Sequence, residues 1–298
     1  MKQITLLLLL VSVTSWAQIK GNKTIETQTF TTESIERVKI NLYAKITIDQ
    51  SSTENSISIT ADSNLFDLIA KELDNGELAL DQIEWISPSE PIIIKIGAPD
   101  LKRVDSGTHD TTRIINVNND YLQIMAPIGN VIVEGRTKEL RLGAELATID
   151  ASEMIAEDVY VNLWKYGKIT VNPQNKLWAD VSNDGRLIYL NKPEDFTKKT
   201  KNGGRIVAQS EAETLKNPNA EFIKFKIKNN SSNRNQFYVV GPKPDGSKFS
   251  YGFPMMPNSK RNENWSVGTK VYKVSALGFK KLLVKIKKED EGKVVNLF

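Results

Sequence analysis

Four apolar strand patterns recur along the chain at a nearly constant spacing, and this period constrains the fold more than any other feature. The patterns begin at Leu122, Leu140, Val159 and Leu177, which are 18 or 19 residues apart. In each pattern the positions two and four residues further on are also apolar, as in a strand that buries one face. A unit of this length cannot bury its own apolar face, so we expect the units to stack, each strand pairing with its counterpart in the next turn. A second apolar pair follows each pattern after a turn: Val131 and Val133, Ile149 and Ala151, Ile169 and Val171, and Leu187 and Tyr189.

This stacking predicts an all-β protein in which residues 35–197 form a single-stranded β-helix-like solenoid. A meander of antiparallel hairpins is the alternative, because Asn183-Asp184-Gly185 is also a suitable hairpin turn. The solenoid is favoured, since a meander does not require the same class of buried residue at a fixed period. One short helix is expected from Ser63 to Leu73, ended by Asn75-Gly76, where it would cap the open N-terminal end of the solenoid.

The sequence after the solenoid differs in charge and in strand pattern. Residues 217–298 carry a net charge of +10, whereas residues 1–216 carry −6. Alternating strands separated by turn-rich segments such as Pro242–Gly246 predict a small C-terminal β-sandwich over residues 217–298. Residues 18–34 are expected to lead into the first domain, and the polar residues 198–216 to link it to the second.

The first 17 residues have the three regions of a secretory signal peptide. Lys2 provides the positive charge, Leu6–Val11 most of the apolar region, and Ser15-Trp16-Ala17 a small-x-small cleavage site. We therefore expect export, with the mature protein in the periplasm, associated with the outer membrane or outside the cell. The apolar run is shorter than the ~20 residues of a membrane span, so no transmembrane span is expected in the mature chain. An uncleaved signal anchor is the alternative interpretation.

Five segments of the first domain carry a resemblance to a known family: Ile35–Ile40, Ile46–Ile48, Ile57–Asp62, Asp74–Leu78 and Leu101–Gly107. Through them, the stretch from Ile35 to about Lys192 resembles the head GIN domain family of "putative auto-transporter adhesins", exported proteins of Gram-negative bacteria. The resemblance implies an all-β, β-helix-like fold and an adhesin-like role, and it brings no catalytic residues. The chain departs from the family at Leu163-Trp164-Lys165-Tyr166, where bulky residues replace small Gly and Ser turns.

Outward-facing side chains of neighbouring turns are expected to form columns, because stacked parallel strands lie about 4.8 Å apart. Tyr160 over Trp178 would make an exposed aromatic surface that can stack on a sugar ring or an extended peptide. Arg141, Asn162 and Asp180 would lie beside it and complete a candidate ligand-binding site. A ladder that only stabilises neighbouring turns, or a patch covered by the C-terminal domain, would account for the same residues.

A second candidate site is the basic surface of the C-terminal domain. An exported protein meets anionic lipid headgroups, lipopolysaccharide and acidic glycans rather than nucleic acid, and clustered lysines attract such polyanions. Solvated strand faces, or docking on the acidic half of the chain, would account for the same charges. The lysines predicted to contact an anionic surface are Lys224, Lys226, Lys228, Lys280, Lys281, Lys285, Lys287 and Lys288.

The sequence does not indicate an enzyme. Cysteine is absent and His109 is the single histidine, which excludes thiol chemistry and cysteine-based zinc sites. His109 lies near Asp105 and Asp110, a grouping more typical of a polar loop than of an acid/base set. No nucleotide, cofactor or metal motif is present, so no cofactor and no metal site are expected.

The predicted function is that of a non-enzymatic, adhesin-like protein of the cell envelope. Its solenoid would present a binding face to a glycan or a protein, and its basic domain would contact an anionic surface. Lipopolysaccharide and an envelope protein are among the expected partners. Two alternatives stay open. One is a polysaccharide-degrading β-helix enzyme, since Asp150 and Asp180 are both expected to point outward. The other is a purely structural role in envelope assembly.

Overall fold

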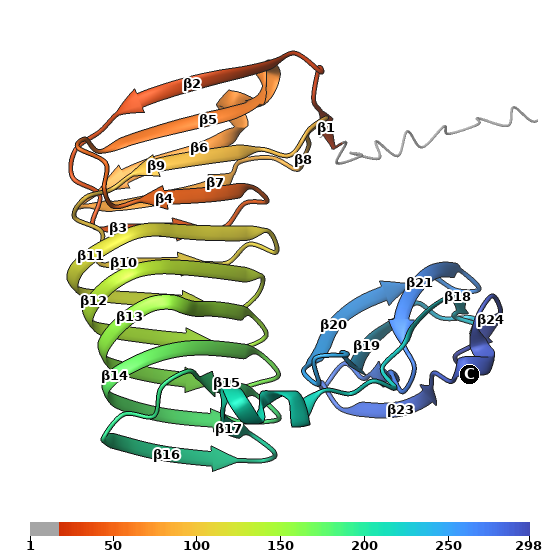
Figure 1. Cartoon of the computed structure of the whole chain (residues 1–298). Coiled ribbons are helices and arrows are strands. Elements are labelled where there is room, and N and C mark those ends of the chain that lie inside the picture. The colour runs from red at the N-terminus through yellow and green to blue at the C-terminus, as the bar shows by residue number, and fades with distance from the viewer. Residues whose placement is uncertain (1–17) are drawn as a thin grey trace, which may run out of the picture.

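The computed structural model describes residues 18–298, so the expected signal peptide, residues 1–17, lies outside the described residues. Figure 1 shows a β-solenoid whose turns stack from the N-terminal end at the top to β16 at the bottom, with a smaller β unit beside its last turns. The solenoid has about six turns and the fold is nearly all β, as the sequence predicts. No helix in this described part of the chain is long and apolar enough to cross a membrane.

The regular part of the solenoid consists of four long strands that pair in parallel. They are β11 (Thr111–Ala126), β12 (Asn130–Ala144), β13 (Thr148–Leu163) and β14 (Lys168–Ser182). Leu122 pairs with Leu140, Leu140 with Val159, and Val159 with Leu177, and all four side chains are completely buried. The period in the sequence is therefore one solenoid turn, and the antiparallel meander is wrong.

Long strands pass around a corner of the solenoid, where their register with the neighbouring turn shifts. The shift lies between Ile114 and Val117 in β11 and between Ile132 and Gly135 in β12. Gly135 has a φ of 128°, a backbone conformation that residues with a Cβ rarely adopt. A Cβ on Gly135 would overlap the carbonyl oxygen of Val117 and lie 2.5 Å from its nitrogen, so this corner requires glycine.

The N-terminal end of the solenoid is capped by strands, and the helix expected there is shorter than the sequence indicated. The 3₁₀ helix η1 covers only Ser63–Leu68, and β6 (Ile69–Asp74) follows it directly. Asn75 and Gly76 both have positive φ and join β6 to its antiparallel partner β7 (Glu77–Gln82), so they form a hairpin turn and not a helix stop. An isolated helix of about ten residues is marginal in water, whereas pairing with β7 extends an existing sheet.

The residues expected to lead into the domain form an outer strand of the same cap. Strand β2 (Ile25–Thr31) pairs antiparallel with β5 (Ser56–Asp62), which in turn pairs antiparallel with β9 (Ile93–Gly97). Strand β9 then continues the stack through its parallel pairing with β4. The other short strands at this end are β1 (Ile19–Lys20), β3 (Arg37–Ile40), β4 (Lys45–Asp49), β8 (Ile86–Ser87) and β10 (Arg103–Ser106).

One buried carboxylate ties this cap together. Asp62 is fully buried and accepts hydrogen bonds from the backbone amide of Lys23 at 2.7 Å, and from the backbone amide and hydroxyl of Ser89 at 2.8 and 2.6 Å. Burial opposes ionisation of the carboxyl group, but these hydrogen bonds outweigh it, so the pKa of Asp62 is lowered. The cap therefore depends on an ionised carboxylate.

The solenoid extends further toward the C-terminus than the sequence indicated. Its last strands are β15 (Arg186–Tyr189), β16 (Asp195–Lys201) and β17 (Arg205–Ala208), all paired in parallel with the preceding turn. Most of residues 198–208, which were expected to lie in the linker 198–216, therefore belong to the sheet, and Ile206 is part of the solenoid core. The 3₁₀ helix η2 (Gln209–Leu215) follows the last strand.

The C-terminal residues form two sheets packed around a separate apolar core, the expected β-sandwich. The sheet orders are β21-β18-β24 and β20-β19-β22-β23. Phe225 and Trp265 contribute to the core from the first sheet, and Phe237 and Val271 from the second. The strands are β18 (Phe222–Lys228), β19 (Asn235–Pro242), β20 (Lys248–Met255), β21 (Lys260–Ser266), β22 (Lys270–Val274), β23 (Lys280–Lys285) and β24 (Val294–Asn296), and the 3₁₀ helix η3 (Lys288–Asp290) precedes β24.

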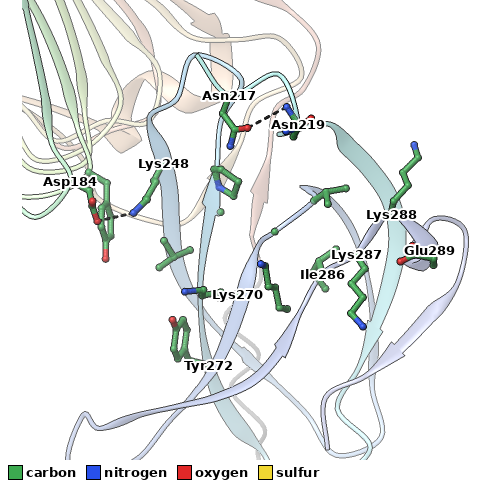
Figure 2. A pocket seen from close by; sticks show the side chains of 17 residues that line it. Asp184, Asn217, Asn219, Lys248, Lys270, Tyr272, Ile286, Lys287, Lys288 and Glu289 are labelled. Atoms are coloured by element: carbon green, nitrogen blue, oxygen red, sulfur yellow. Dashed lines mark hydrogen bonds and ion pairs between the residues drawn. The ribbon is translucent and has the colours of Figure 1, made fainter. Parts of the chain in front are cut away.

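Polar contacts join the sandwich to the last solenoid turns. Lys248 Nζ lies 2.7 Å from a carboxylate oxygen of Asp184, as Figure 2 shows. Lys168 Nζ lies 3.8 Å from the carboxylate of Asp245, whose backbone carbonyl accepts a hydrogen bond from Arg186 at 3.0 Å. Each unit thus contributes a carboxylate and at least one cation to the contact.

Candidate ligand-binding site

The outward column expected from the period is present on one face of the solenoid. Arg141 pairs with Tyr160, and Tyr160 with Trp178, in parallel register. Two residues further along the same strands, Asn162 pairs with Asp180. Because alternate residues of a strand share a face, the stacking brings all five predicted residues onto one surface.

Four of these residues border an open groove of about 530 Å³. They are Arg141, Tyr160, Asn162 and Trp178, whereas Asp180 lies outside the lining and pairs in register with Lys199 of β16. The groove combines aromatic rings, amide groups and one guanidinium, so it can both stack and hydrogen-bond with a ligand. The remaining lining residues are Gln123, Met125, Leu142, Gly143 and Trp164.

Cationic side chains already lie over the two central rings. The guanidinium carbon of Arg141 is 5.2 Å from the ring centroid of Tyr160, and Lys199 Nζ is 5.2 Å from that of Trp178. Arg141 also donates from Nε to Glu139 at 2.6 Å, and this hydrogen bond raises the pKa of Arg141. The surface is therefore a row of cation-covered rings and not the bare aromatic platform that the sequence suggested.

Three further lining residues, Gly143, Met125 and Trp164, were not predicted to belong to the site. Gly143 lies in register between Met125 and Asn162 of the neighbouring turns. A Cβ on Gly143 would lie 2.7 Å from the terminal methyl of Met125 and 3.4 Å from the ring of Trp164, so the missing side chain makes room for both. The sequence feature that could have indicated this is Gly143 within a strand, because a glycine there marks a place where another group approaches the backbone closely.

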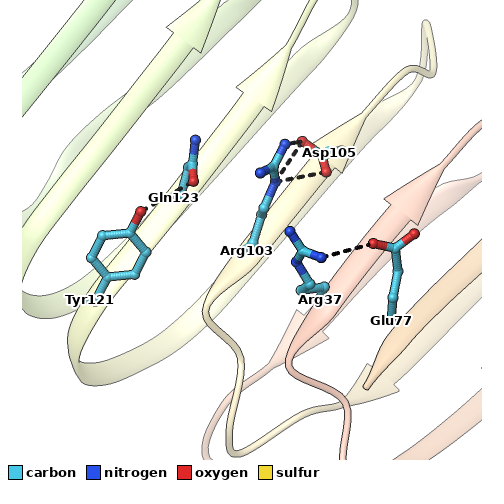
Figure 3. A network of polar contacts seen from close by, with 6 residues as sticks. All are labelled: Arg37, Glu77, Arg103, Asp105, Tyr121 and Gln123. Atoms are coloured by element: carbon cyan, nitrogen blue, oxygen red, sulfur yellow. Dashed lines mark hydrogen bonds and ion pairs between the residues drawn. The ribbon is translucent and has the colours of Figure 1, made fainter. Parts of the chain in front are cut away.

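Toward the N-terminal end the same face is closed by polar pairs, shown in Figure 3. Gln123 pairs in register with Arg103, which pairs with Arg37. Arg103 donates to both carboxylate oxygens of Asp105 at 2.9 to 3.1 Å, and Arg37 lies 3.4 Å from Glu77. The guanidinium groups of Arg103 and Arg37 are already paired with carboxylates. The groove therefore begins at Gln123, the next residue of the column.

The lysines predicted to contact an anionic surface do not form one patch. Lys224, Lys226 and Lys228 alternate with buried residues on β18, in the three-stranded sheet. Lys280 and Lys281 begin β23, at the edge of the opposite sheet and beside the turn that joins it to β22.

The other three predicted lysines border the space between the two units. Lys285, Lys287 and Lys288 line a cavity of about 880 Å³, bounded by Asp184 on the solenoid side, and Figure 2 shows two of them. Lys288 is paired with Glu221 and with Glu291. Part of the predicted basic surface is therefore neutralised within the chain.

The residues around the single histidine do not assemble into a catalytic set. Asp105 forms its ion pair with Arg103, and the exposed ring of His109 stacks on Tyr43 with 5.9 Å between centroids. In the part of the chain that the structure describes, no hydrogen bond joins His109 to Asp105 or Asp110. Over residues 18–298, no group of three or more His, Asp or Glu side chains is placed to hold a metal ion.

The family model "Putative auto-transporter adhesin, head GIN domain" matches residues 34–127 and 114–193, which together make up more than half of the chain. The chain belongs to this family. The two matches cover the solenoid from β3 to β15, including the whole groove, so the resemblance found in the sequence is confirmed. Membership places the chain among adhesin-like proteins.

A solved structure shares the solenoid fold. A "putative adhesin" from Bacteroides fragilis is 19% identical, with 64% of this chain and 99% of that chain aligned and a TM-score of 0.55. A "putative lipid binding protein" from Parabacteroides distasonis is 19% identical over 64% of this chain and 99% of its own, with a TM-score of 0.44. A "putative adhesin" from Parabacteroides merdae is 18% identical over 64% and 98%, with a TM-score of 0.45. No curated protein matches the chain.

Proposed function

We propose that this chain is an exported, non-enzymatic protein of the cell envelope, whose solenoid binds a glycan in the groove bordered by Arg141, Tyr160, Asn162 and Trp178. The observation that carries the proposal is the register of Tyr160 with Trp178 beside the guanidinium of Arg141 and the amide of Asn162. A sugar ring has apolar C–H faces that stack on aromatic rings and hydroxyl groups that need polar partners at the rim. Membership of an adhesin-like family supports this proposal.

A glycan suits the groove better than an extended peptide. Strands β12 and β13 have hydrogen-bonded neighbours on both sides, so this part of the groove offers no free strand edge to which a peptide could add. Recognition must therefore come from side chains. Because successive turns lie about 4.8 Å apart, a linear glycan along the solenoid axis would present successive sugar rings to successive turns.

A glycan array probed with the mature chain, followed by calorimetry on the glycans that bind, tests this proposal. Replacing Trp178 or Tyr160 with alanine is expected to weaken binding about tenfold, because an aromatic contact contributes on the order of 1 to 1.5 kcal/mol. Trp85→Ala is the matched control, since Trp85 is 60% exposed and lies outside the groove. Equal affinity in wild type and both groove variants, or cleavage of any glycan, would contradict the proposal.

For the sandwich we propose contact with an anionic surface. The supporting observation is the row of Lys224, Lys226 and Lys228 on β18, of which the first two are exposed and the third is half-buried, with Lys260 directly opposite Lys228 on β21. Such a row attracts lipid headgroups or lipopolysaccharide through forces that weaken as salt rises. Sedimentation with lipopolysaccharide or anionic vesicles over a salt series checks this. Retention that ignores salt, or no binding at low salt, would reject an electrostatic contact.

A further inference from the structure

The turn between β22 and β23 exposes apolar side chains to an unusual degree. Leu277 is 84% exposed and Phe279 73%, the highest values for large hydrophobic residues in the described part of the chain. Leu282, three residues further, is 50% exposed. The sandwich has a well-formed apolar core, and its other exposed large apolar residues, of which Met256 at 60% is the highest, are less exposed than Leu277 and Phe279. Adjoining apolar residues left in water mark a contact surface.

The tip is held in a defined conformation. The amide of Ser275 donates to the carbonyl of Phe279 at 2.9 Å, and the amide of Gly278 donates to the carbonyl of Ser275 at 2.9 Å. The hydroxyl of Ser275 accepts a further hydrogen bond from the amide of Phe279 at 3.0 Å. Gly278 has a φ of 81° and supplies the reversal of the chain. The turn therefore presents Leu277 and Phe279 on a preformed support.

The two strands below the tip carry only positive charge. Residues 270–285 contain five lysines and no Asp or Glu. Lys270 lies directly opposite Lys285, and Lys273 directly opposite Lys281; Figure 2 shows Lys270 on this sheet. Like charges at opposed positions destabilise a sheet. Lys270 and Lys285 line the cavity between the two units, whereas an anionic partner at Lys273 and Lys281, the pair nearer the tip, would remove the repulsion there.

We propose that the β22–β23 hairpin is a membrane-insertion element, which places Leu277 and Phe279 in the acyl boundary of an anionic lipid bilayer while Lys273 and Lys281 beside the tip bind the headgroups. Two apolar side chains are too small an area for a stable protein interface, which buries about 800 Å² on each partner. They suffice at a membrane surface when basic residues add electrostatic attraction. The inference rests on the proposed contact of the sandwich with an anionic surface, and it does not depend on the glycan groove.

Sedimentation of the full mature chain with vesicles tests the inference. Phosphatidylcholine vesicles and mixed phosphatidylcholine–phosphatidylglycerol vesicles are compared over a salt series. Wild type is expected to bind the mixed vesicles and to retain part of this binding at high salt, because insertion of apolar groups is not screened. The double variant Leu277→Ser, Phe279→Ser is expected to lose at least about tenfold in partitioning. Met256→Ser, which removes another exposed apolar residue of the sandwich, is the control and should bind as wild type does.

Lysine variants separate the electrostatic contribution to vesicle binding from the contribution of apolar insertion. Lys273→Gln with Lys281→Gln is expected to weaken binding about fivefold per lysine at low salt and hardly at all at high salt. If the tip double variant binds as wild type while the lysine variant does not, the hairpin does not insert, and only the electrostatic contact of the sandwich remains. If wild type binds no anionic vesicle at any salt, the insertion proposal fails, and if it also binds no lipopolysaccharide, the electrostatic contact of the sandwich fails with it. Self-association that the tip variant abolishes, without vesicle binding, would instead assign the tip to a contact between copies of this chain.

Discussion

Replacing Gly135, at the corner between neighbouring turns, with alanine is expected to destabilise the solenoid strongly. The φ of 128° at Gly135 is strained for a residue with a Cβ, which costs about 1 to 3 kcal/mol. The added Cβ would also lie 2.5 Å from the nitrogen and 2.8 Å from the Cα of Val117, and would overlap its carbonyl oxygen. These are backbone atoms, so the corner itself must move and weaken the pairing of Gly135 with Val117 and Met154. With about 1 kcal/mol for each of one or two weakened hydrogen bonds, the total loss is about 2 to 5 kcal/mol.

Urea denaturation followed by far-ultraviolet circular dichroism measures this loss as a change in the free energy of unfolding. Gly252→Ala is the matched control, because the nearest atom to its added Cβ is the carbonyl oxygen of Phe237 at an ordinary 3.5 Å. That substitution is expected to change the free energy of unfolding by less than about 1 kcal/mol. A loss below about 1 kcal/mol for Gly135→Ala would refute the argument that neighbouring turns meet backbone to backbone at this corner.

Three further predictions concern the core, the cap and the contact between the units. Leu140→Ala should cost about 3 kcal/mol in urea denaturation, because Leu140 is fully buried between neighbouring turns; a cost below about 1 kcal/mol would mean that the site is not enclosed. The lowered pKa of Asp62 makes its contribution to stability present above the unfolded value and lost as the pH falls below about 4. Asp62→Asn should therefore unfold more easily at neutral pH, by about 1 to 3 kcal/mol, and thermal melts across pH should show a weaker acid dependence than wild type. Lys248→Gln should cost no more than about 1 kcal/mol, since its ion pair with Asp184 is partly exposed; a larger loss in the same melts would indicate a tightly coupled interface.

The regular turns could be predicted from the sequence because buried apolar residues recur at equivalent positions in each of them. Leu140 and Val159 occupy equivalent positions, and a slip of one residue would turn every buried side chain outward. The capped end could not be predicted in the same way. Asn75-Gly76 serves equally well as a helix stop and as a hairpin turn, and Leu65 and Ile69 are buried in either arrangement. Only the pairing of β6 with β7, a contact outside the local sequence, decides between the two.

The part of the candidate site that follows from the register of neighbouring turns could be predicted from the sequence. Tyr160 and Trp178 were brought together correctly because they occupy equivalent positions in neighbouring turns. Trp164 follows the last residue of β13, beyond the repeat, and the place of Met125 depends on the missing side chain of Gly143. The sequence shows that the sandwich is rich in lysine, but it does not show which lysines share a surface. The order of strands in the two sheets decides which of them share a face.

The most direct test of the central proposal is the crystal structure of the chain in complex with a glycan that it binds. We expect a sugar ring stacked on Tyr160 or Trp178, with its hydroxyl groups hydrogen-bonded to Arg141 or Asn162. A glycan bound in the cavity between the solenoid and the sandwich, or at the β22–β23 hairpin, with the groove empty in the same crystal, would contradict it.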